Sequence, residues 1–317
     1  MGGGGHGVVT VGARYGDLAV TWLIKPDRMD TGAVVQVRIL GSIGVVESGA
    51  EMALSPQQAR LLGLLVVADG GFVSADRIAE HLADGDVDGS KIRTAVSRLR
   101  KVLGDRIETV PSGYRLRLAD GELDAARFES LQDRARTAAS PQRIELSVEA
   151  LGLWRGDALE GVADEEWATP AAARLESARA VLTEDLADAL SEVGRFEEAI
   201  ELLETHLVDH PYRERPIASL MRALAGAGRL PDALRTFQRF RVTLRDEMGL
   251  DPSPELRDLE AELLAASDGD SDGSAGARGQ NERDALPGNH SGHPDEGVAV
   301  AGLPDGATVT ILFTDIE

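Results

Sequence analysis

The first third of the chain alternates short strand-like and helical patterns of apolar residues. Residues 34–46, VVQVRILGSIGVV, are rich in β-branched side chains and interrupted by glycine, as is typical of short strands. The next segment, LSPQQARLLGLLVVADGG, offers Ser55 as N-cap, Pro56 at the first helical position and a glycine pair as a stop signal. A second helix is predicted to begin at the cap Ser74, and a third to run from about Ser90 to Leu103.

A β-hairpin is predicted directly after the third helix. The runs RIETV and YRLRL flank a Pro-Ser-Gly turn at residues 111–113. From residue 34 to residue 119 the predicted order is therefore strands, three helices and a hairpin.

After about Asp124 the strand signals stop, and helical patterns continue to about Ala266. Within this region GRFEEAIELLE (194–204) and GRLPDALRTFQ (228–238) align at a spacing of 34 residues. That period is typical of tetratricopeptide (TPR)-type helical hairpins, in which small residues allow close helix packing. The matching pairs are Gly194 and Gly228, Arg195 and Arg229, and Ala199 and Ala233.

Both ends of the chain lack these patterns. Residues 1–33 are glycine-rich at the start, which leaves an ordered extension, a flexible tail and a stretch upstream of a start at Met29 as alternatives. Residues 267–306 are predicted to be a disordered linker, because they cannot bury enough apolar surface to become ordered. Residues 307–317, ATVTILFTDIE, return to a buried-strand pattern.

Charge is concentrated unevenly along the chain. The net charge at pH 7 is −21, yet residues 34–118 hold 11 basic and 10 acidic residues, against 19 basic and 41 acidic residues in 119–317. Ser90–Arg117 alone holds eight basic and two acidic residues. The overall acidity argues against a general polyanion binder, so the basic segment indicates one focused site.

Composition also limits the class of protein. The 317 residues suffice for two domains with their own cores, and no stretch approaches the ~20 apolar residues that span a bilayer. The absence of cysteine excludes disulfides, thiol nucleophiles and thiolate metal sites. The start MGGGGHGVV has neither a basic leader nor an apolar secretory core, so we expect a cytoplasmic protein without a membrane partner.

The third predicted helix has one apolar face and one basic face. Ile92, Val96, Leu99 and Leu103 follow one stripe of the helix, which predicts burial. A solvated basic face is the alternative for an isolated helix, but here a basic hairpin follows a three-helix unit. Arg can bind guanine through two hydrogen bonds, and Lys and hydroxyl groups can anchor phosphates or read base edges, which suits a DNA major groove. The polar positions are Lys91, Arg93, Thr94, Ser97, Arg98 and Lys101.

Residues 34–118 resemble the winged-helix DNA-binding domain of OmpR/PhoB-type response regulators, with IETVPSGYRL close to that family's wing. The turn VPSGY and the start VRILGSIGV are more similar to the Streptomyces antibiotic regulatory protein (SARP) family and its AfsR-like relatives. Residues 124–266, including EEWATPAAARLE and ALRTFQRFRVTLRDEMGLDPSPELRDLEAELL, resemble the bacterial transcriptional activator domain of that family.

The resemblance implies roles for particular residues. Helix 90–103 would be the recognition helix, Tyr114 would pack the wing against the body, and Arg115 or Arg117 would approach the DNA backbone or minor groove. The wing tip holds Pro111-Ser112 where OmpR-type wings usually carry Arg, so a phosphate contact from Arg106 or Arg115 is expected instead. Without a receiver domain before the winged helix, aspartyl phosphorylation is not the expected input.

Two acidic loops resemble the opening of a calcium-binding loop. DGDVDG (84–89) has Ala95, and DGDSDG (268–273) has Gly279, at the twelfth position, where calcium binding needs a bidentate carboxylate. His206 and His210 have helical metal-pair spacing, but Pro211 follows them and no third ligand is evident. We therefore expect no metal and no cofactor.

The final segment resembles the first strand of class III nucleotide cyclases. The resemblance would align Asp315 with the metal-binding aspartate of those enzymes, but the chain ends two residues later. An eleven-residue remnant cannot catalyse a reaction, so we expect no enzyme activity. We expect the chain to be a fragment or a truncated relative of a regulator that carries a cyclase-like module.

These patterns predict a mainly α protein with a small β component: a winged helix-turn-helix domain (34–119) followed by a TPR-like helical repeat domain (124–266). The predicted function is sequence-specific regulation of transcription, as an activator, through double-stranded promoter DNA. The family resemblance adds RNA polymerase as a partner and self-association on DNA. The alternatives are the regulatory part of a larger cyclase-containing protein and a protein-docking scaffold.

Overall fold

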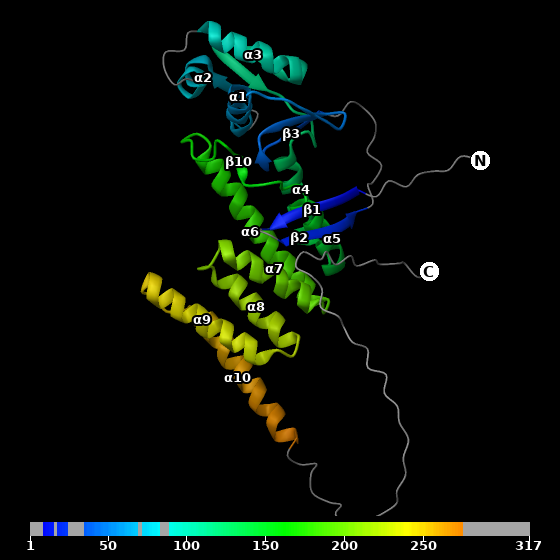
Figure 1. The fold of residues 1–317 in the computed structure, drawn as a ribbon, viewed down its shortest axis with the longest axis vertical. Coiled ribbons are helices and arrows are strands. Elements are labelled where there is room, and N and C mark those ends of the chain that lie inside the picture. The colour runs from blue at the N-terminus through cyan, green and yellow to red at the C-terminus, as the bar shows by residue number, and fades with distance from the viewer. Residues whose placement is uncertain (1–8, 16–17, 25–34, 69–71, 83–88, 275–317) are drawn as a thin grey trace, which may run out of the picture. The chain divides into compact units, whose positions relative to one another are not determined.

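The computed structural model of the chain describes residues 9–15, 18–24, 35–68, 72–82 and 89–274, with side chains described from 35 to 266 (Figure 1). The described part is mainly helical with short strands, which confirms the predicted fold class. No helix in these ranges combines the length and apolar character needed to cross a bilayer.

The segment from residue 35 to residue 116 forms the predicted winged helix. An antiparallel sheet, β3 (Val35–Arg38), β5 (Gly44–Glu47) and β6 (Ala50–Met52), precedes three helices. The hairpin of β8 and β9 follows them and adds the short β7 along its β9 edge. The remaining elements are α1 (Pro56–Val67), β7 (Phe72–Ser74), α2 (Ala75–Leu82), α3 (Gly89–Leu103), a 3-10 turn (Gly104–Arg106), β8 (Ile107–Val110) and β9 (Gly113–Leu116).

Local sequence signals set the helix ends in this segment. Ser55 accepts a hydrogen bond from the Gln58 N–H, and the Gln58 side chain accepts one from the Ser55 N–H, so a capping box starts α1. Helix α3 ends where Gly104 adopts a positive φ of 59°, which favours glycine. Both predicted boundaries are confirmed.

Between residues 117 and 274, all of which the structure describes, seven helices follow, and each packs against the next up to α9. In the predicted repeat, Gly194 and Gly228 both have a positive φ at the turn before a helix, and Ala199 and Ala233 are both fully buried. The 34-residue repeat is therefore confirmed, because in each copy a glycine turn precedes a helix that carries a buried alanine. The helices are α4 (Asp124–Thr137), α5 (Ser140–Leu151), α6 (Thr169–Glu192), α7 (Phe196–Asp209), α8 (Glu214–Gly226), α9 (Leu230–Met248) and α10 (Pro254–Ser274).

Two sequence predictions are wrong in this region. Strand β10 (Ala158–Glu160) lies inside the segment predicted to be free of strands and pairs in parallel with β4 (Gly41–Ser42). Helix α10 continues to Ser274, eight residues into the predicted disordered linker. Strand β10 was missed because three residues show no periodicity and the strand depends on a distant partner. Helix α10 runs past its predicted end because an existing helix extends without a new nucleation step.

Of the alternatives for residues 1–33, an ordered element agrees with the structure. β1 (Val9–Tyr15) and β2 (Leu18–Ile24) pair as an antiparallel hairpin. The predicted terminal strand at 307–317 lies outside the described residues.

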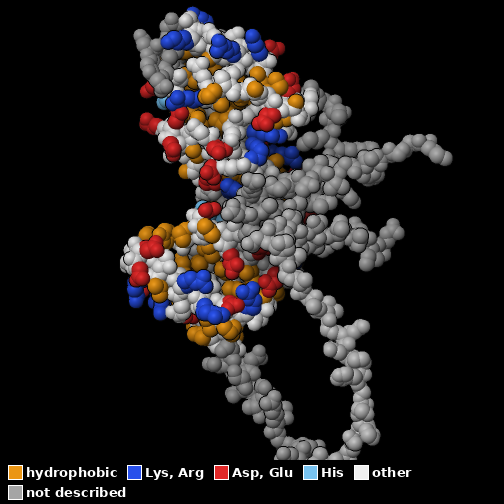
Figure 2. All heavy atoms as spheres, in the orientation of Figure 1, with side chains coloured by type: hydrophobic (Ala, Val, Ile, Leu, Met, Phe, Trp, Pro, Cys, Tyr) orange, Lys and Arg blue, Asp and Glu red, His pale blue; other side chains and the backbone are white. Residues whose placement is uncertain are grey.

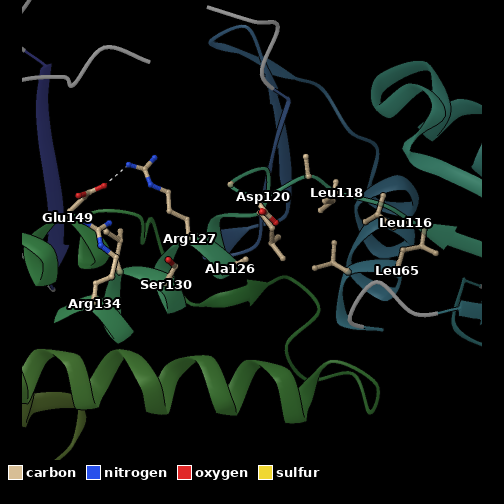
Figure 3. Close-up of a pocket in the computed structure, with 14 residues that line it drawn as sticks. Leu65, Leu116, Leu118, Asp120, Ala126, Arg127, Ser130, Arg134 and Glu149 are labelled. Atoms are coloured by element: carbon tan, nitrogen blue, oxygen red, sulfur yellow. Dashed lines mark hydrogen bonds and ion pairs between the residues drawn. The ribbon is translucent and has the colours of Figure 1, made fainter. Parts of the chain in front are cut away.

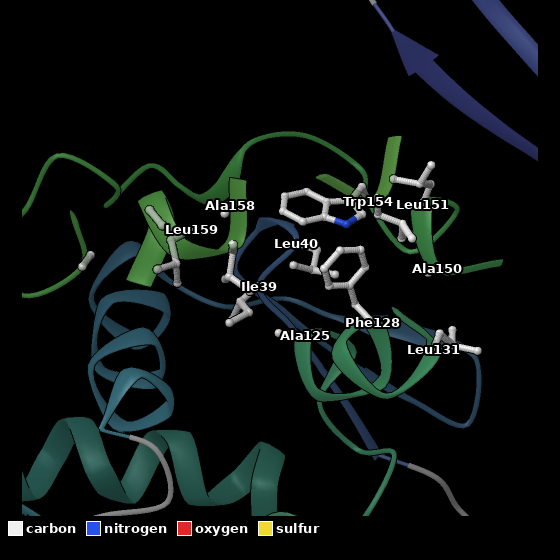
Figure 4. Close-up of a cluster of buried hydrophobic side chains, with 14 of the residues drawn as sticks. Ile39, Leu40, Ala125, Phe128, Leu131, Ala150, Leu151, Trp154, Ala158 and Leu159 are labelled. Atoms are coloured by element: carbon white, nitrogen blue, oxygen red, sulfur yellow. The ribbon is translucent and has the colours of Figure 1, made fainter. Parts of the chain in front are cut away.

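The winged helix and the helical segment share one contiguous apolar core. In Figure 4, Ile39 and Leu40 lie between side chains of α4 and the residues around β10. Phe128 meets Trp154 edge to face at a centroid distance of 5.4 Å, a favourable aromatic geometry. The two predicted segments, 34–119 and 124–266, therefore meet through buried side chains.

One buried carboxylate and one backbone carbonyl join the segments through the backbone of β3 and the residues after it. Asp124 accepts the N–H of Ile39 at 2.9 Å and that of Leu40 at 3.2 Å, and pairs with Arg155 at 2.7 Å. The Glu122 carbonyl accepts the N–H of Val37 at 2.7 Å. These bonds fix the start of α4 against β3.

We predict that Asp124→Ala lowers the free energy of unfolding by about 3 kcal/mol, because it leaves two buried N–H groups and Arg155 without their acceptor. Urea unfolding followed by circular dichroism measures the change. Asp133→Ala, at an exposed position of α4, is the control and should change stability by less than about 0.5 kcal/mol. Equal effects of the two substitutions would contradict the structural role of Asp124.

A buried charged cluster lies between α6 and the α7–α8 hairpin. Glu184 is fully buried, with Arg213 at 2.6 Å, and His206 and Arg215 each at 3.5 Å from its carboxylate. Burial alone would raise the pKa of Glu184, but His206 and the two guanidinium groups outweigh it and hold that pKa below its usual value. The sequence pattern gave no sign of this cluster.

We predict that Glu184 makes stability dependent on pH. Because its pKa is lowered in the folded state, its contribution is present above the unfolded pKa of about 4.3 and is lost as pH falls through the folded pKa. Urea unfolding should show Glu184→Gln to be less stable than the wild type at neutral pH, with the difference shrinking in acid. Glu201→Gln, on the exposed side of α7, should show no such convergence.

Candidate nucleic-acid interface

Helix α3 presents one buried face and one exposed polar face. Ile92, Val96, Leu99 and Leu103 are at most 3% exposed, which confirms the predicted stripe. The opposite face carries the six predicted residues, all exposed: Lys91, Arg93, Thr94, Ser97, Arg98 and Lys101. Lys and Arg side chains gather on the surface over α3 (Figure 2).

The charged groups of this face are largely uncommitted within the protein. In the described part of the chain, Arg93, Arg98 and Lys101 make no ion pair or side-chain hydrogen bond. The Thr94 hydroxyl donates to the Ser90 carbonyl at 2.9 Å, within the helix. Three cationic side chains held in water on a rigid helix are suited to phosphate oxygens and base edges.

Arg100 joins α3 to the wing. Its Nε and Nη2 donate to the Ile107 carbonyl at 2.9 and 2.8 Å, and Nη2 also donates to the Thr109 hydroxyl at 2.8 Å. The same guanidinium lies 5.9 Å from the centre of the Tyr114 ring. Tyr114 is partly buried against the core, in agreement with its expected role of packing the wing against the body. Arg100 is one of the eight basic residues of Ser90–Arg117, but the sequence alone did not predict this structural role.

Arg115 lies on the outer face of the β7–β9–β8 sheet. Its cross-strand neighbours are Phe72 on β7 and Glu108 on β8. The adjacent cross-strand row consists of Val73, Tyr114 and Thr109. Side chains alternate between faces along a strand, and the row with buried Val73 faces the helices. The sheet therefore does not bring Arg115 together with the polar face of α3.

Arg106 is held by an ion pair rather than left available. Its guanidinium donates to both oxygens of Glu122, at 2.5 Å for the shortest contact, and this hydrogen bond holds the pKa of Glu122 below its usual value. A phosphate contact from Arg106 would need this pair to break, so the structure does not favour the predicted role. Arg117 is likewise paired, with Glu108 at 2.7 Å.

The wing tip is a tight turn with no cationic side chain. Pro111 and Ser112 are exposed, and Ser112 has a positive φ of 66°. Gly113 allows β9 to lie close to β7, because a Cβ atom at this position would lie 2.2 Å from the Val73 carbonyl oxygen. The tip can offer a hydroxyl and backbone groups to DNA, but no charge.

Other sequence candidates receive structural explanations. His206 is buried beside Glu184, and His210 follows the last residue of α7, so these histidines lie at a helix end as expected. Within the described residues no group of three or more potential ligands is placed to hold a metal ion. The acidic loop at 84–88 lies outside the described residues.

Two family models match this architecture. The model described as "Transcriptional regulatory protein, C terminal" matches residues 49–116, and the "Bacterial transcriptional activator domain" matches residues 123–264. A winged helix with an exposed basic recognition helix, joined to an activator domain, defines the class of transcriptional regulators with an OmpR-like DNA-binding domain. Both models end before residue 307, so the cyclase resemblance of the last eleven residues remains a sequence-based prediction.

Individual relatives narrow this class. Transcriptional regulator RedD of Streptomyces coelicolor is 32% identical over 256 residues, which cover 76% of this chain and 73% of RedD. Regulatory protein AfsR of Streptomyces griseus is 36% identical over 222 residues, or 68% of this chain and 23% of AfsR. The chain belongs to the Streptomyces antibiotic regulatory protein family. It spans about a quarter of the length of its AfsR relatives.

A solved structure agrees with the fold. Mycobacterium tuberculosis EmbR, in complex with a low-affinity phosphopeptide, aligns with a TM-score of 0.69 and 29% identity over 74% of this chain and 65% of EmbR.

We predict that Arg100→Ala loosens the wing while leaving α3 folded, because it removes three hydrogen bonds between α3 and β8. Amide hydrogen exchange should become faster in β8 and β9, and the free energy of unfolding should fall by roughly 1–2 kcal/mol. Lys101→Ala, at the exposed neighbouring position, should change neither quantity measurably. Unchanged exchange in Arg100→Ala would show that the wing is held by other contacts.

Proposed function

We propose that the protein is a transcription regulator, acting as an activator, that binds double-stranded promoter DNA in a sequence-specific manner through α3. The observation that carries this proposal is the exposed face of α3, where Arg93, Arg98 and Lys101 have no ion pair or side-chain hydrogen bond with any described residue, while the opposite face is buried. Membership of a family of transcriptional regulators supports the same function.

The contacts divide by position. We assign base reading to Arg93 and Arg98, and phosphate or base-edge contacts to the other polar residues of the face. Arg100 and Arg106 instead hold the wing and the segment junction in place, as their bonds indicate. Arg115, on the outer face of the sheet, is left with at most a phosphate contact at the flank of the site.

The helical segment is proposed to serve protein partners. Residues 119–317 carry 19 basic and 41 acidic residues, so their net charge repels DNA. RNA polymerase and a second protomer bound to DNA are the partners that we propose, with the cytoplasm as the location. A docking scaffold that uses the winged helix to hold proteins is the competing function.

We predict that Arg98→Ala in the full chain weakens specific DNA binding by roughly 1–3 kcal/mol if Arg98 reads a base. Fluorescence anisotropy with a duplex from the promoter beside its own gene, against a scrambled duplex, measures this change. A role limited to phosphate would weaken both duplexes equally and reduce the slope of log K against log salt by about 0.9.

The matched control is Arg241→Ala, which removes an exposed arginine of α9 and should leave binding unchanged. If the wild-type chain binds neither duplex at low salt, DNA binding is wrong and the docking scaffold is favoured. Equal binding of both duplexes by the wild type would contradict recognition of that promoter sequence.

A further inference from the structure

A groove of about 730 Å³ lies where the winged helix meets α4 (Figure 3). Its walls come from the last half of α1, the end of β9, residues 118–123 and one face of α4, with Glu149 of α5 at one end. Cavities of roughly 300–1,000 Å³ are typical of small-molecule sites. The α3 face lies on another part of the winged helix, so the groove is separate from the proposed DNA contacts.

The end of the groove opposite Arg134 is apolar (Figure 3). Leu65 and Leu116 belong to the winged-helix core, and Leu131 of α4 also lines the groove; all three are at most 3% exposed. Leu118 is only partly buried and adds exposed apolar surface beside Leu116 (Figure 3). An apolar ligand body placed here would cover the exposed part of Leu118, which the protein itself leaves in contact with water.

One end of the groove is cationic. Arg127, Ser130 and Arg134 are spaced at i, i+3 and i+7 on α4, so they share one face of the helix. Arg127 donates to Glu149 at 2.6 Å, which neutralises one charge. Arg134 is exposed and forms no ion pair with any described residue. The Ser130 hydroxyl lies between the two arginines along the helix and supplies a further donor.

The charges also limit the ligand. Asp120 lines the groove away from the arginines, beside the leucines, and Glu149 is the second carboxylate of the lining. Two carboxylates disfavour a polyanion such as a nucleotide triphosphate, whereas a single negative charge is favourable only beside Arg134.

We propose that this groove binds a small amphipathic monoanion, an aliphatic carboxylate or a molecule of the same chemistry. The carboxylate accepts hydrogen bonds from Arg134 and Ser130, while Arg127 stays paired with Glu149. The apolar chain lies over Leu118 and Ala126, two apolar lining residues that are not already buried. Because the ligand contacts both the winged helix and α4, it stabilises the junction between them.

The test uses the full chain, with decanoate as the probe and decan-1-ol as its uncharged counterpart, in isothermal titration calorimetry. Decanoate should bind, and decan-1-ol should bind about tenfold more weakly, because it lacks the charge-assisted hydrogen bonds. Arg134→Gln should weaken decanoate binding at least about tenfold and leave the affinity for decan-1-ol unchanged. Bound decanoate should also raise Tm.

Two further variants locate the site. Ala126→Phe places a ring into the groove from an exposed position of α4 and should abolish binding without altering charge. Arg136→Gln removes an exposed arginine that pairs with Asp133 on the same helix, outside the groove lining, and should bind decanoate like the wild type. The proposal is overturned by absent wild-type binding, by equal binding to Arg134→Gln, or by full binding to Ala126→Phe. Failure here leaves the DNA-binding proposal untouched, since no variant alters α3.

Discussion

Two backbone N–H groups, at Ile39 and Leu40, need an acceptor where the chain leaves β3 inside the apolar core. Asp124 supplies it from the first turn of α4, and Arg155 compensates the buried charge. A buried carboxylate without these partners would cost several kcal/mol, so the three groups require one another. This constraint fixes α4 against β3. The winged helix and the helical segment consequently share a core instead of forming two bodies on a tether.

The arginines of the winged helix divide by their surroundings. Where a guanidinium lies near the core it satisfies buried acceptors, as Arg100 does at Ile107 and Arg106 at Glu122. On the outer face of α3, Arg93 and Arg98 meet no acceptor within the described structure and remain available to an external anion. Because the side chains are the same, burial decides whether a guanidinium is paired inside the protein or left exposed.

Local signals explain which parts of the fold could be predicted. The capping box at Ser55, the stripe of Ile92 to Leu103 and the glycine at 104 each act within a few residues, so a sequence window contains all the partners. Strand β10 could not be predicted in this way, because its pairing partner β4 lies more than a hundred residues away. The pairing of Arg106 with Glu122 was missed for a similar reason, since the 3-10 turn and the entry to α4 meet only in the folded chain.

The sequence by itself determined the class of fold, the two faces of α3 and the 34-residue repeat, because periodicity, caps and charge spacing are properties of neighbouring residues. Only the tertiary structure decided which basic residues are free. Arg98 and Arg106 belong to the same basic segment. Glu122 pairs with Arg106, whereas Arg98 remains exposed. The same packing brought Arg134 and the leucines of the winged helix into the lining of one groove. Long-range packing sets these outcomes, because burial and the position of opposite charges depend on residues far apart in the chain.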